Sequence, residues 1–229
     1  MQVYSRKIAI NKKKFVSYIG ILLISLSIVA IIFETSLNGT KTVRVACIGD
    51  SITREYGYPS MLQALLGDNY TVENFGSSSS TVLFNTDKPY ISEAELTAAK
   101  EFQPDIAVIM LGTNDARTDY FKSIDNFVSD YLVLIDELQA LKSKPKIFLV
   151  TPPPLFNNTL SLESVNLVEG IIPRIEQIVD EKGLPIIDVY SVLEDHPEYF
   201  PDGVHPNSEG SSIIADMVYN ALVLYGEAS

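Results

Sequence analysis

Short apolar runs alternate along the chain with longer segments in which apolar residues recur every three or four positions. Runs of this length that contain several Ile and Val residues are typical of buried parallel strands. They lie at 43–48, 71–75, 105–111, 146–151 and 185–189. The longer segments predict amphipathic helices at 57–67, 93–102, 123–143 and 164–182. Regular alternation of strands and helices predicts an α/β fold built on one parallel sheet.

Two helices carry further signals. Pro173 lies inside the fourth helix, where a residue without an N–H should kink or split it. A last helix is predicted after Asn207 or Ser208, because either side chain can cap it and apolar residues then recur at helical spacing as far as Tyr225.

An uncharged stretch of 19 residues, 15–33, follows five basic residues near the amino terminus. As a helix it would span about 30 Å of hydrocarbon. A cleaved signal peptide and a buried core helix are the alternatives, but the stretch is longer than the usual apolar part of a signal and no Ala-x-Ala site follows it. We therefore expect an uncleaved transmembrane anchor at 15–33, with a basic tail at 1–14 in the cytoplasm.

After the predicted anchor, the chain consists of a short tether at 34–42 and one domain at 43–229. A chain of 229 residues with 46% hydrophobic content can bury one sizeable core but hardly two. The basic residues before the anchor predict that this domain lies outside the cytoplasm, or is secreted if the anchor is cleaved.

The charge of the chain limits the classes of partner that it can bind. Residues 41–229 contain 12 Lys plus Arg against 28 Asp plus Glu, a net charge of −16, whereas the first 40 residues carry +4. A domain this acidic repels a phosphate backbone, so we expect no nucleic-acid partner. Polyanionic substrates are disfavoured for the same reason, and neutral ones are easier to accommodate.

Cysteine and histidine are scarce. Cys47 is the single cysteine and lies within the first apolar run, so we interpret it as a core residue. His196 and His205 are the only histidines, and we expect His196 to lie on a loop. Without a cluster of Cys and His at zinc spacing, a metal hydrolase is not expected.

The sequence Gly49-Asp50-Ser51 directly follows the first apolar run. It places a serine hydroxyl at the carboxyl end of a parallel strand, which is the edge where open α/β sheets bind ligands. Asp and Ser are also common in turns and helix caps, so the tripeptide alone does not establish a site. Residues further along the chain decide between the two interpretations.

Asp202 lies three residues before His205, on a loop that ends in the last helix. There the carboxylate can hold one imidazole nitrogen and fix the tautomer, so that the other nitrogen can take a proton from Ser51. An isolated pair of this kind is usually a surface turn, but the pair and Ser51 explain each other.

Two further strand ends carry candidate hydrogen-bond donors. Asn114 follows the strand at 105–111, and its side-chain amide can donate to a negatively charged oxygen. Gly76 follows the strand at 71–75, where the missing side chain lets the backbone approach a ligand. A capping Asn and an ordinary turn glycine are the alternatives.

Together these residues resemble the SGNH, or GDSL-type, hydrolases. The blocks occur in the family's order, with Gly-Asp-Ser at 49–51, Gly76, Gly-Thr-Asn-Asp at 112–115 and Asp-Gly-Val-His at 202–205. The resemblance covers nearly all of the chain after residue 42. It implies a flavodoxin-like three-layer α/β/α sandwich with a five-stranded parallel sheet.

The resemblance also implies a role for each residue and no cofactor. Ser51 would be the nucleophile, His205 the general base and then acid, and Asp202 the group that orients His205. The Ser51 amide, the Gly76 amide and the Asn114 side chain would form the oxyanion hole.

The stretch at 200–210, with the three prolines at 152–154, is most similar to the branch that acts on acetylated carbohydrates, such as sialate or xylan O-acetylesterases. We therefore expect a serine esterase whose substrate is a small ester or an O-acetylated carbohydrate. A lysophospholipase or thioesterase would use the same residues on longer acyl chains. A carbohydrate-binding module on this fold, the non-enzymatic alternative, would be expected to tolerate loss of Ser51 or His205.

Other polar residues near the blocks have less specific interpretations. We expect the irregular stretches at 76–92 and 152–163 to border the crevice and to shape specificity. The serines at 77–80 could contact substrate, but we expect them to form a flexible turn. Asp50 and Asp115 are interpreted as turn-stabilising carboxylates without a chemical role. A last set could contact substrate or belong to the surface of a helix start: Arg54, Tyr56 and Tyr58.

Overall fold

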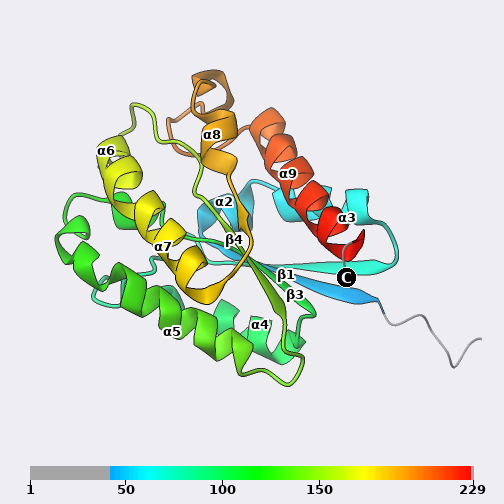
Figure 1. Cartoon of the computed structure of the whole chain (residues 1–229). Helices are drawn as coiled ribbons and strands as arrows, with labels where there is room; N and C mark the ends of the chain where they lie inside the picture. The colour runs from blue at the N-terminus through cyan, green and yellow to red at the C-terminus, as the bar shows by residue number, and fades with distance from the viewer. Residues whose placement is uncertain (1–41, 228–229) are drawn as a thin grey trace, which may run out of the picture. The chain divides into compact units, whose positions relative to one another are not determined.

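Five parallel strands form the centre of the structure, a computed structural model that describes residues 42–227 (Figure 1). The strands are β1 (Val43–Gly49), β2 (Tyr70–Gly76), β3 (Ile106–Met110), β4 (Lys146–Val150) and β5 (Ile186–Ile187). Their order across the sheet is β2-β1-β3-β4-β5, which is the order of flavodoxin-like sheets. The predicted α/β fold with a five-stranded parallel sheet is confirmed.

Helices cover both faces of the sheet, and each face has its own core. One core joins the strands to α4 (Ala94–Phe102), α5 (Phe127–Gln139) and α7 (Ile172–Lys182). The other joins them to α3 (Tyr58–Leu66), α8 (Val189–Leu193) and α9 (Ser208–Glu227). Because helices cover the central strands on both sides, the sequences of these strands are continuous apolar runs. Cys47 is fully buried in the second core, as predicted, and burial raises the pKa of its thiol to about 12.

The fourth predicted helix is split at the expected place. It consists of α6 (Ser164–Asn166), a π-helical turn (Leu167–Ile171) and α7, which carries Pro173 in its first turn. A proline is tolerated there because the first N–H groups of a helix have no intrahelical partner. The last helix is α9, and Asn207 caps it by accepting a hydrogen bond from the Gly210 amide at 3.0 Å.

Two short helices were not predicted. The first is α2 (Ser51–Glu55), which follows β1 directly. The second is α8, whose cap Asp188 accepts a hydrogen bond from the Ser191 amide at 3.1 Å. This cap ends β5 after two residues, so the strand predicted at 185–189 is shorter than expected. Helices of five residues are too short to show a helical period in the sequence.

The predicted tail at 1–14, the anchor at 15–33 and nearly all of the tether at 34–42 lie outside the described residues. Between residues 42 and 227, no helix has the length and apolar character needed to cross a membrane.

Candidate active site

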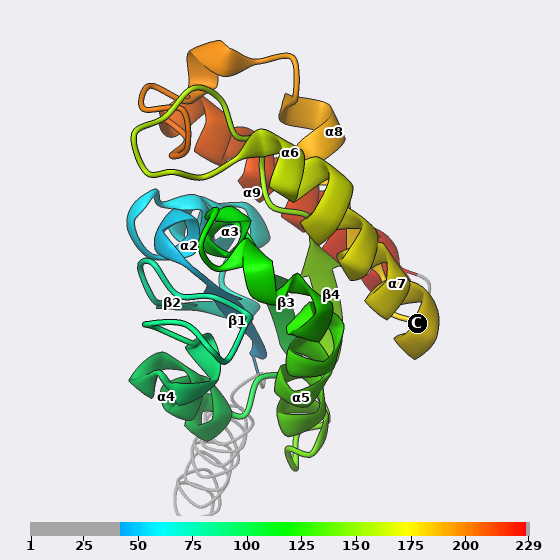
Figure 2. The same ribbon diagram turned by 90° about the vertical axis from the view of Figure 1, so that its left-hand side faces the viewer.

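Ser51 stands at the carboxyl end of β1, where the chain turns into α2. Asp50 makes this turn by accepting a hydrogen bond from the Ile52 amide at 3.0 Å, which caps the helix. β1 lies between β2 and β3 in the sheet, so Ser51 is at the point where the strand order reverses and where ligands bind in such sheets. Figure 2 shows α2 at this end of the sheet.

The structure brings together the three residues predicted to form a triad. The Ser51 hydroxyl lies 2.9 Å from Nε2 of His205, and Nδ1 of the same ring lies 2.6 Å from Oδ2 of Asp202. Ser51 and His205 are 154 positions apart in the sequence. A continuous chain of hydrogen bonds therefore runs from the serine hydroxyl through the imidazole to the carboxylate, as serine acyl-transfer chemistry requires.

The second oxygen of Asp202 fixes the loop that carries His205. Oδ1 accepts hydrogen bonds from the amides of Val204 at 2.9 Å and of His205 at 2.7 Å. Burial opposes the charge of this carboxylate, but these bonds and the bond to the imidazole outweigh it and hold the pKa of Asp202 below its usual value. Gly203 has a φ of +82°, and a Cβ there would lie 2.2 Å from the Asn157 carbonyl oxygen, so the turn requires glycine.

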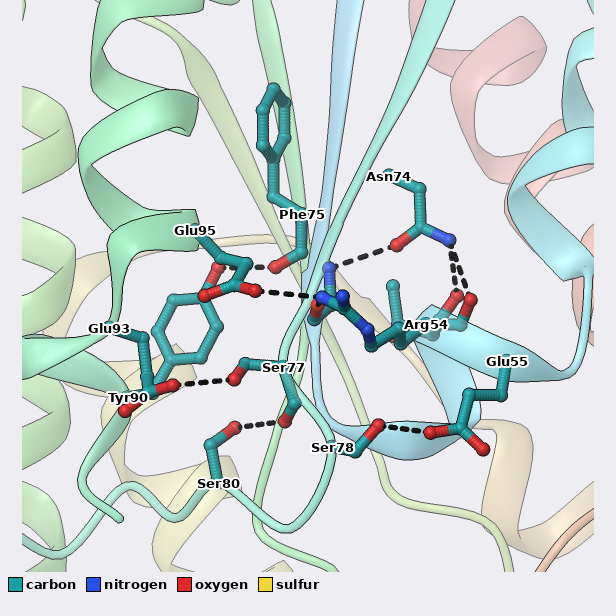
Figure 3. Close-up of polar contacts among 12 residues, drawn as sticks. Arg54, Glu55, Asn74, Phe75, Ser77, Ser78, Ser80, Tyr90, Glu93 and Glu95 are labelled. Atoms are coloured by element: carbon teal, nitrogen blue, oxygen red, sulfur yellow. Dashed lines mark hydrogen bonds and ion pairs between the residues drawn. The ribbon is translucent and has the colours of Figure 1, made fainter.

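Tyr56 stacks on the imidazole of His205, with ring centroids 4.6 Å apart and an angle of 14° between the planes. Of the three residues Arg54, Tyr56 and Tyr58, it is the one that faces the site. The Tyr58 side chain is 1% exposed and packs in the core, so the suggestion that it contacts substrate is wrong. Arg54 instead ties α2 to its neighbours, donating to the Gly76 carbonyl at 2.9 Å and pairing with Glu95 at 2.7 Å (Figure 3).

Asn114 follows β3 and points its amide toward the same edge of the sheet. Its Nδ2 donates to the Ser80 carbonyl at 3.0 Å and lies 3.4 Å from Oδ2 of Asp50. The second distance is long for a hydrogen bond, so one N–H is held and the other is only weakly engaged. That N–H can therefore turn to a stronger acceptor.

The amide of Gly76 is not free to face a ligand, as its predicted role requires. Gly76 is buried as the last residue of β2, and its amide donates to Oδ1 of Asn74 at 2.9 Å. A Cβ at Gly76 would lie 2.4 Å from the Arg54 amide nitrogen, so the glycine permits close packing against α2 and not the approach of a ligand. Because its amide already has a partner, the predicted role of Gly76 in the oxyanion hole is corrected.

The serines at 77–80, expected to form a flexible turn, are held by their neighbours (Figure 3). Ser77 is buried, and its hydroxyl donates a hydrogen bond to Glu93 at 2.7 Å. The Ser77 carbonyl accepts a hydrogen bond from the Ser80 hydroxyl. Ser78 donates to Glu55 of α2. The loop is thereby fixed to α2 on one side and to the segment before α4 on the other.

Ser79 is the exception within this loop. It is exposed and has a φ of +66°, a conformation that non-glycine residues seldom adopt and that costs about 1–3 kcal/mol. Within residues 42–227 its amide donates no backbone hydrogen bond, and Ser79 borders the same small hollow as Asn114. A strained backbone amide without a partner among the described residues, beside Asn114, makes the Ser79 amide a candidate oxyanion donor in place of Gly76.

Two buried carboxylates support the loops around Ser51. Asp115 accepts hydrogen bonds from the amides of Val82 at 3.0 Å and Leu83 at 2.8 Å, and Asp50 caps α2. Burial is the main reason that the pKa rises to about 7 for Asp115 and to about 6 for Asp50. These contacts confirm the turn-stabilising interpretation of both residues.

Two hollows adjoin the site on different sides. The smaller has a volume of about 110 Å³ and is bordered by Ser79 and Asn114, with Leu160 and Leu162 from the loop after β4. Both loops predicted to border the crevice, at 76–92 and 152–163, therefore do so. The larger, of about 580 Å³, adjoins Asp202 and His205 and is otherwise formed by residues 55–61 and 201–208. The sequence did not indicate it, apart from Tyr56.

His196 lies on a loop, as predicted, and Nδ1 of its ring is 2.8 Å from Glu198. Across residues 42–227, no group of three or more His, Cys, Asp or Glu side chains gathers as a metal site would require.

Comparison with known proteins decides the family. The sequence signature of the GDSL-like lipase/acylhydrolase family matches residues 47–213, from β1 into α9. The chain belongs to this family. Its predicted membership of the GDSL-type group is thus confirmed, and the family is named for lipases and acylhydrolases.

Individual relatives of this GDSL-family chain include carbohydrate esterases. It is 36% identical to an acetylxylan esterase of Xylanibacter ruminicola over 79% of its own length, although it spans only 43% of that protein. Among solved structures, it resembles a carbohydrate acetylesterase family member from Sinorhizobium meliloti, with a TM-score of 0.64 and 22% identity, covering 80% of this chain and 98% of the other. An acetyl xylan esterase, AlAXEase, gives a TM-score of 0.62 at 24% identity over 78% and 99%. These structural likenesses show a shared fold.

Proposed function

We propose that the chain is a serine esterase that removes small acyl groups, above all acetyl, from carbohydrate. The observation that carries the proposal is the hydrogen-bonded chain from Ser51 through His205 to Asp202. The relatives named for acetylxylan and carbohydrate acetyl esters support the substrate class.

In the first step the Ser51 hydroxyl attacks the ester carbonyl while its proton passes to Nε2 of His205. The carbonyl oxygen becomes an oxyanion. The imidazolium then gives the proton to the departing alcohol oxygen, which leaves an acyl group on Ser51. Asp202 holds Nδ1 protonated throughout and stabilises the imidazolium.

The oxyanion is stabilised by the amide of Ser51, the side chain of Asn114 and, in place of Gly76, the amide of Ser79. The Ser51 amide begins α2 and makes no backbone hydrogen bond within the described part of the chain. In the second step, water gives a proton to His205, attacks the acyl group and releases the acid, and Ser51 regains its proton.

The small hollow beside Asn114 limits the acyl group. Its volume of about 110 Å³ holds about four water-sized groups at roughly 30 Å³ each. An acetyl group fits this space, whereas a long acyl chain would have to displace Leu160 and Leu162. A hollow of about 500 Å³ shares Arg117 and Leu160 with the small one, but its lining is mostly polar and includes Asp119, Lys122 and Glu163, so it does not match the long acyl chain of a lysophospholipase or thioesterase substrate.

We expect kcat/KM for p-nitrophenyl esters to fall at least about tenfold from acetate to octanoate, because an acyl chain with six added methylenes exceeds a hollow of about 110 Å³. Initial rates across the series measure this. A rate that rises with chain length would contradict the proposal and favour the lysophospholipase or thioesterase. Release of acetate from acetylated xylan tests the carbohydrate part.

Replacing Asn114 by alanine should lower kcat about a hundredfold with little change in KM, because an oxyanion donor acts mainly in the transition state. The comparison variant is Ser79→Gly, which keeps the amide and readily adopts φ near +66°, and which should therefore retain the wild-type kcat. Equal rates for Asn114→Ala and the wild type would exclude Asn114 from the oxyanion hole.

The proposal includes a place in the cell. The basic residues and the uncharged stretch at 15–33 support a single-pass anchor with the amino terminus in the cytoplasm and the esterase domain outside it. The full chain should stay in the membrane fraction after alkaline carbonate extraction, and protease added to intact cells should cleave it. Recovery of the protein from the medium, with an amino terminus beyond residue 30, would show a cleaved signal instead.

A further inference from the structure

The larger hollow beside the triad is a groove between two segments that lie far apart in the sequence. One wall comes from the end of α2 and the start of α3, and the other from the loop before α9. Its lining, apart from Glu55 and the triad residues, includes Tyr56, Met61, Pro201, Pro206, Asn207 and Ser208. One wall lies within the stretch at 200–210 that resembles carbohydrate O-acetylesterases, but the sequence did not indicate that a groove forms there.

The chemistry of the reaction decides which part of an ester faces this groove. His205 donates a proton to the departing alcohol, so the alcohol oxygen must lie next to Nε2. Both His205 and Asp202 line the groove, whereas the oxyanion donor Asn114 lines the other hollow. The alcohol therefore extends into the groove, and the acyl group lies on the side of Asn114.

The surface of the groove matches a saccharide. Tyr56, Met61 and the two prolines offer apolar surface, and Asn207 and Ser208 supply polar groups. A pyranose ring has the same division, with C–H groups on its faces and hydroxyls around its edge. The volume of about 580 Å³ exceeds what an ethyl or methyl alcohol would fill.

The charge of the groove distinguishes between classes of saccharide. Glu55 and Asp202 line it, and none of its described lining residues is a Lys or Arg. Carboxylates accept hydrogen bonds from sugar hydroxyls but repel uronate, sialate or phosphate groups.

We propose that this groove binds the alcohol part of the substrate as a neutral pyranose, with the Tyr56 ring, which stacks on His205, forming one wall. The inference rests on the proposed esterase function for its position in the reaction. Saccharide binding itself does not depend on that function, so the two can be tested separately.

The first measurement is a ratio of rates. For the full chain, kcat/KM is measured on acetylated xylobiose, whose alcohol fills the groove, and on ethyl acetate, whose alcohol does not. Ser208→Trp, at the exposed first residue of α9, puts a bulky side chain into the groove. Ser60→Trp, on the exposed surface of α3 and outside the lining, is the matched control.

The ratio of kcat/KM for acetylated xylobiose over ethyl acetate should fall at least tenfold in Ser208→Trp and stay unchanged in Ser60→Trp. The ratio does not depend on the folded fraction, because misfolding lowers both rates equally. An unchanged ratio in Ser208→Trp would overturn the inference.

The second measurement is binding without hydrolysis. Isothermal titration of full-chain Ser51→Ala with xylotriose, a neutral and unacetylated saccharide, should give a dissociation constant that rises at least tenfold when Ser208→Trp is added. Groove-dependent binding without any ester hydrolysis by the wild type would support the inference and defeat the proposed function. Binding that ignores Ser208→Trp, or that prefers glucuronate over xylose, would overturn the inference whatever the catalytic result.

Discussion

Replacing Ser51 by alanine is expected to lower kcat for acetyl ester hydrolysis by at least about 10⁴-fold while leaving the protein folded. The change removes the hydroxyl that lies 2.9 Å from Nε2 of His205 and that would form the acyl-enzyme. The proposed oxyanion donors would remain and would keep a small residual rate over water. Initial rates with p-nitrophenyl acetate and a thermal unfolding curve measure the two parts of this prediction.

The matched control for this substitution is Ser60→Ala. Ser60 is exposed on α3 and lies outside both hollows, so its hydroxyl can be removed without touching the site. We expect wild-type rates in this variant and a shift in unfolding free energy within about 0.5 kcal/mol in both variants. Equal hydrolysis by Ser51→Ala and the wild type would remove the case for catalysis by this serine. Retained saccharide binding would then favour the carbohydrate-binding alternative.

The triad could be predicted from the sequence because each of its members sits in a short and specific local context. Ser51 follows an apolar run, and Asp202 and His205 share one turn before a capped helix. Their proximity to Ser51 was predicted from the complementary chemistry of serine, imidazole and carboxylate and from the resemblance to the GDSL-type hydrolases. The carboxyl ends of parallel strands meet at one edge, which predicts that Asn114 lies near Ser51. The structure confirms this position, because the Asn114 amide lies 3.4 Å from Asp50, the residue before Ser51.

The backbone donor could not be predicted in this way. Gly76 stood where a ligand-facing glycine was expected, but its contacts with Arg54 and Asn74 come from α2 and from within its own strand. Ser79 is a serine in a run of four, and nothing in its chemistry signals a positive φ. That conformation arises from the bonds that fix Ser77, Ser78 and Ser80, which are tertiary contacts.

The groove was missed for a related reason. It forms between residues 55–61 and 201–208, whose proximity depends on the packing of α3 against α9. The stretch at 200–210 resembled carbohydrate O-acetylesterases, but nothing in it indicated that it would form a groove with residues 55–61. Tyr56 was a candidate for contact with substrate, but only the structure shows that its ring lies flat on His205.

Replacing Asp202 by asparagine is expected to lower kcat about a thousandfold, because the amide reverses the tautomer of His205. The orientation of the new side chain is imposed by the backbone. The amides of Val204 and His205 both donate to the position of Oδ1, so the oxygen of the asparagine must remain there. Its NH₂ group then takes the position of Oδ2, which lies 2.6 Å from Nδ1 of the imidazole in the structure.

An NH₂ group at that position can only donate, so Nδ1 must accept and the ring proton moves to Nε2. In this tautomer Nε2 cannot take the proton of Ser51. The loss should therefore appear in kcat, while the unfolding free energy changes little because both backbone amides keep an acceptor. The control is Asp195→Asn, an exposed aspartate seven residues earlier, which should retain the wild-type kcat. Because the Asp202 side chain is 52% exposed, water can compete for Nδ1, and a loss below about tenfold would mean that solvent, and not this carboxylate, sets the tautomer.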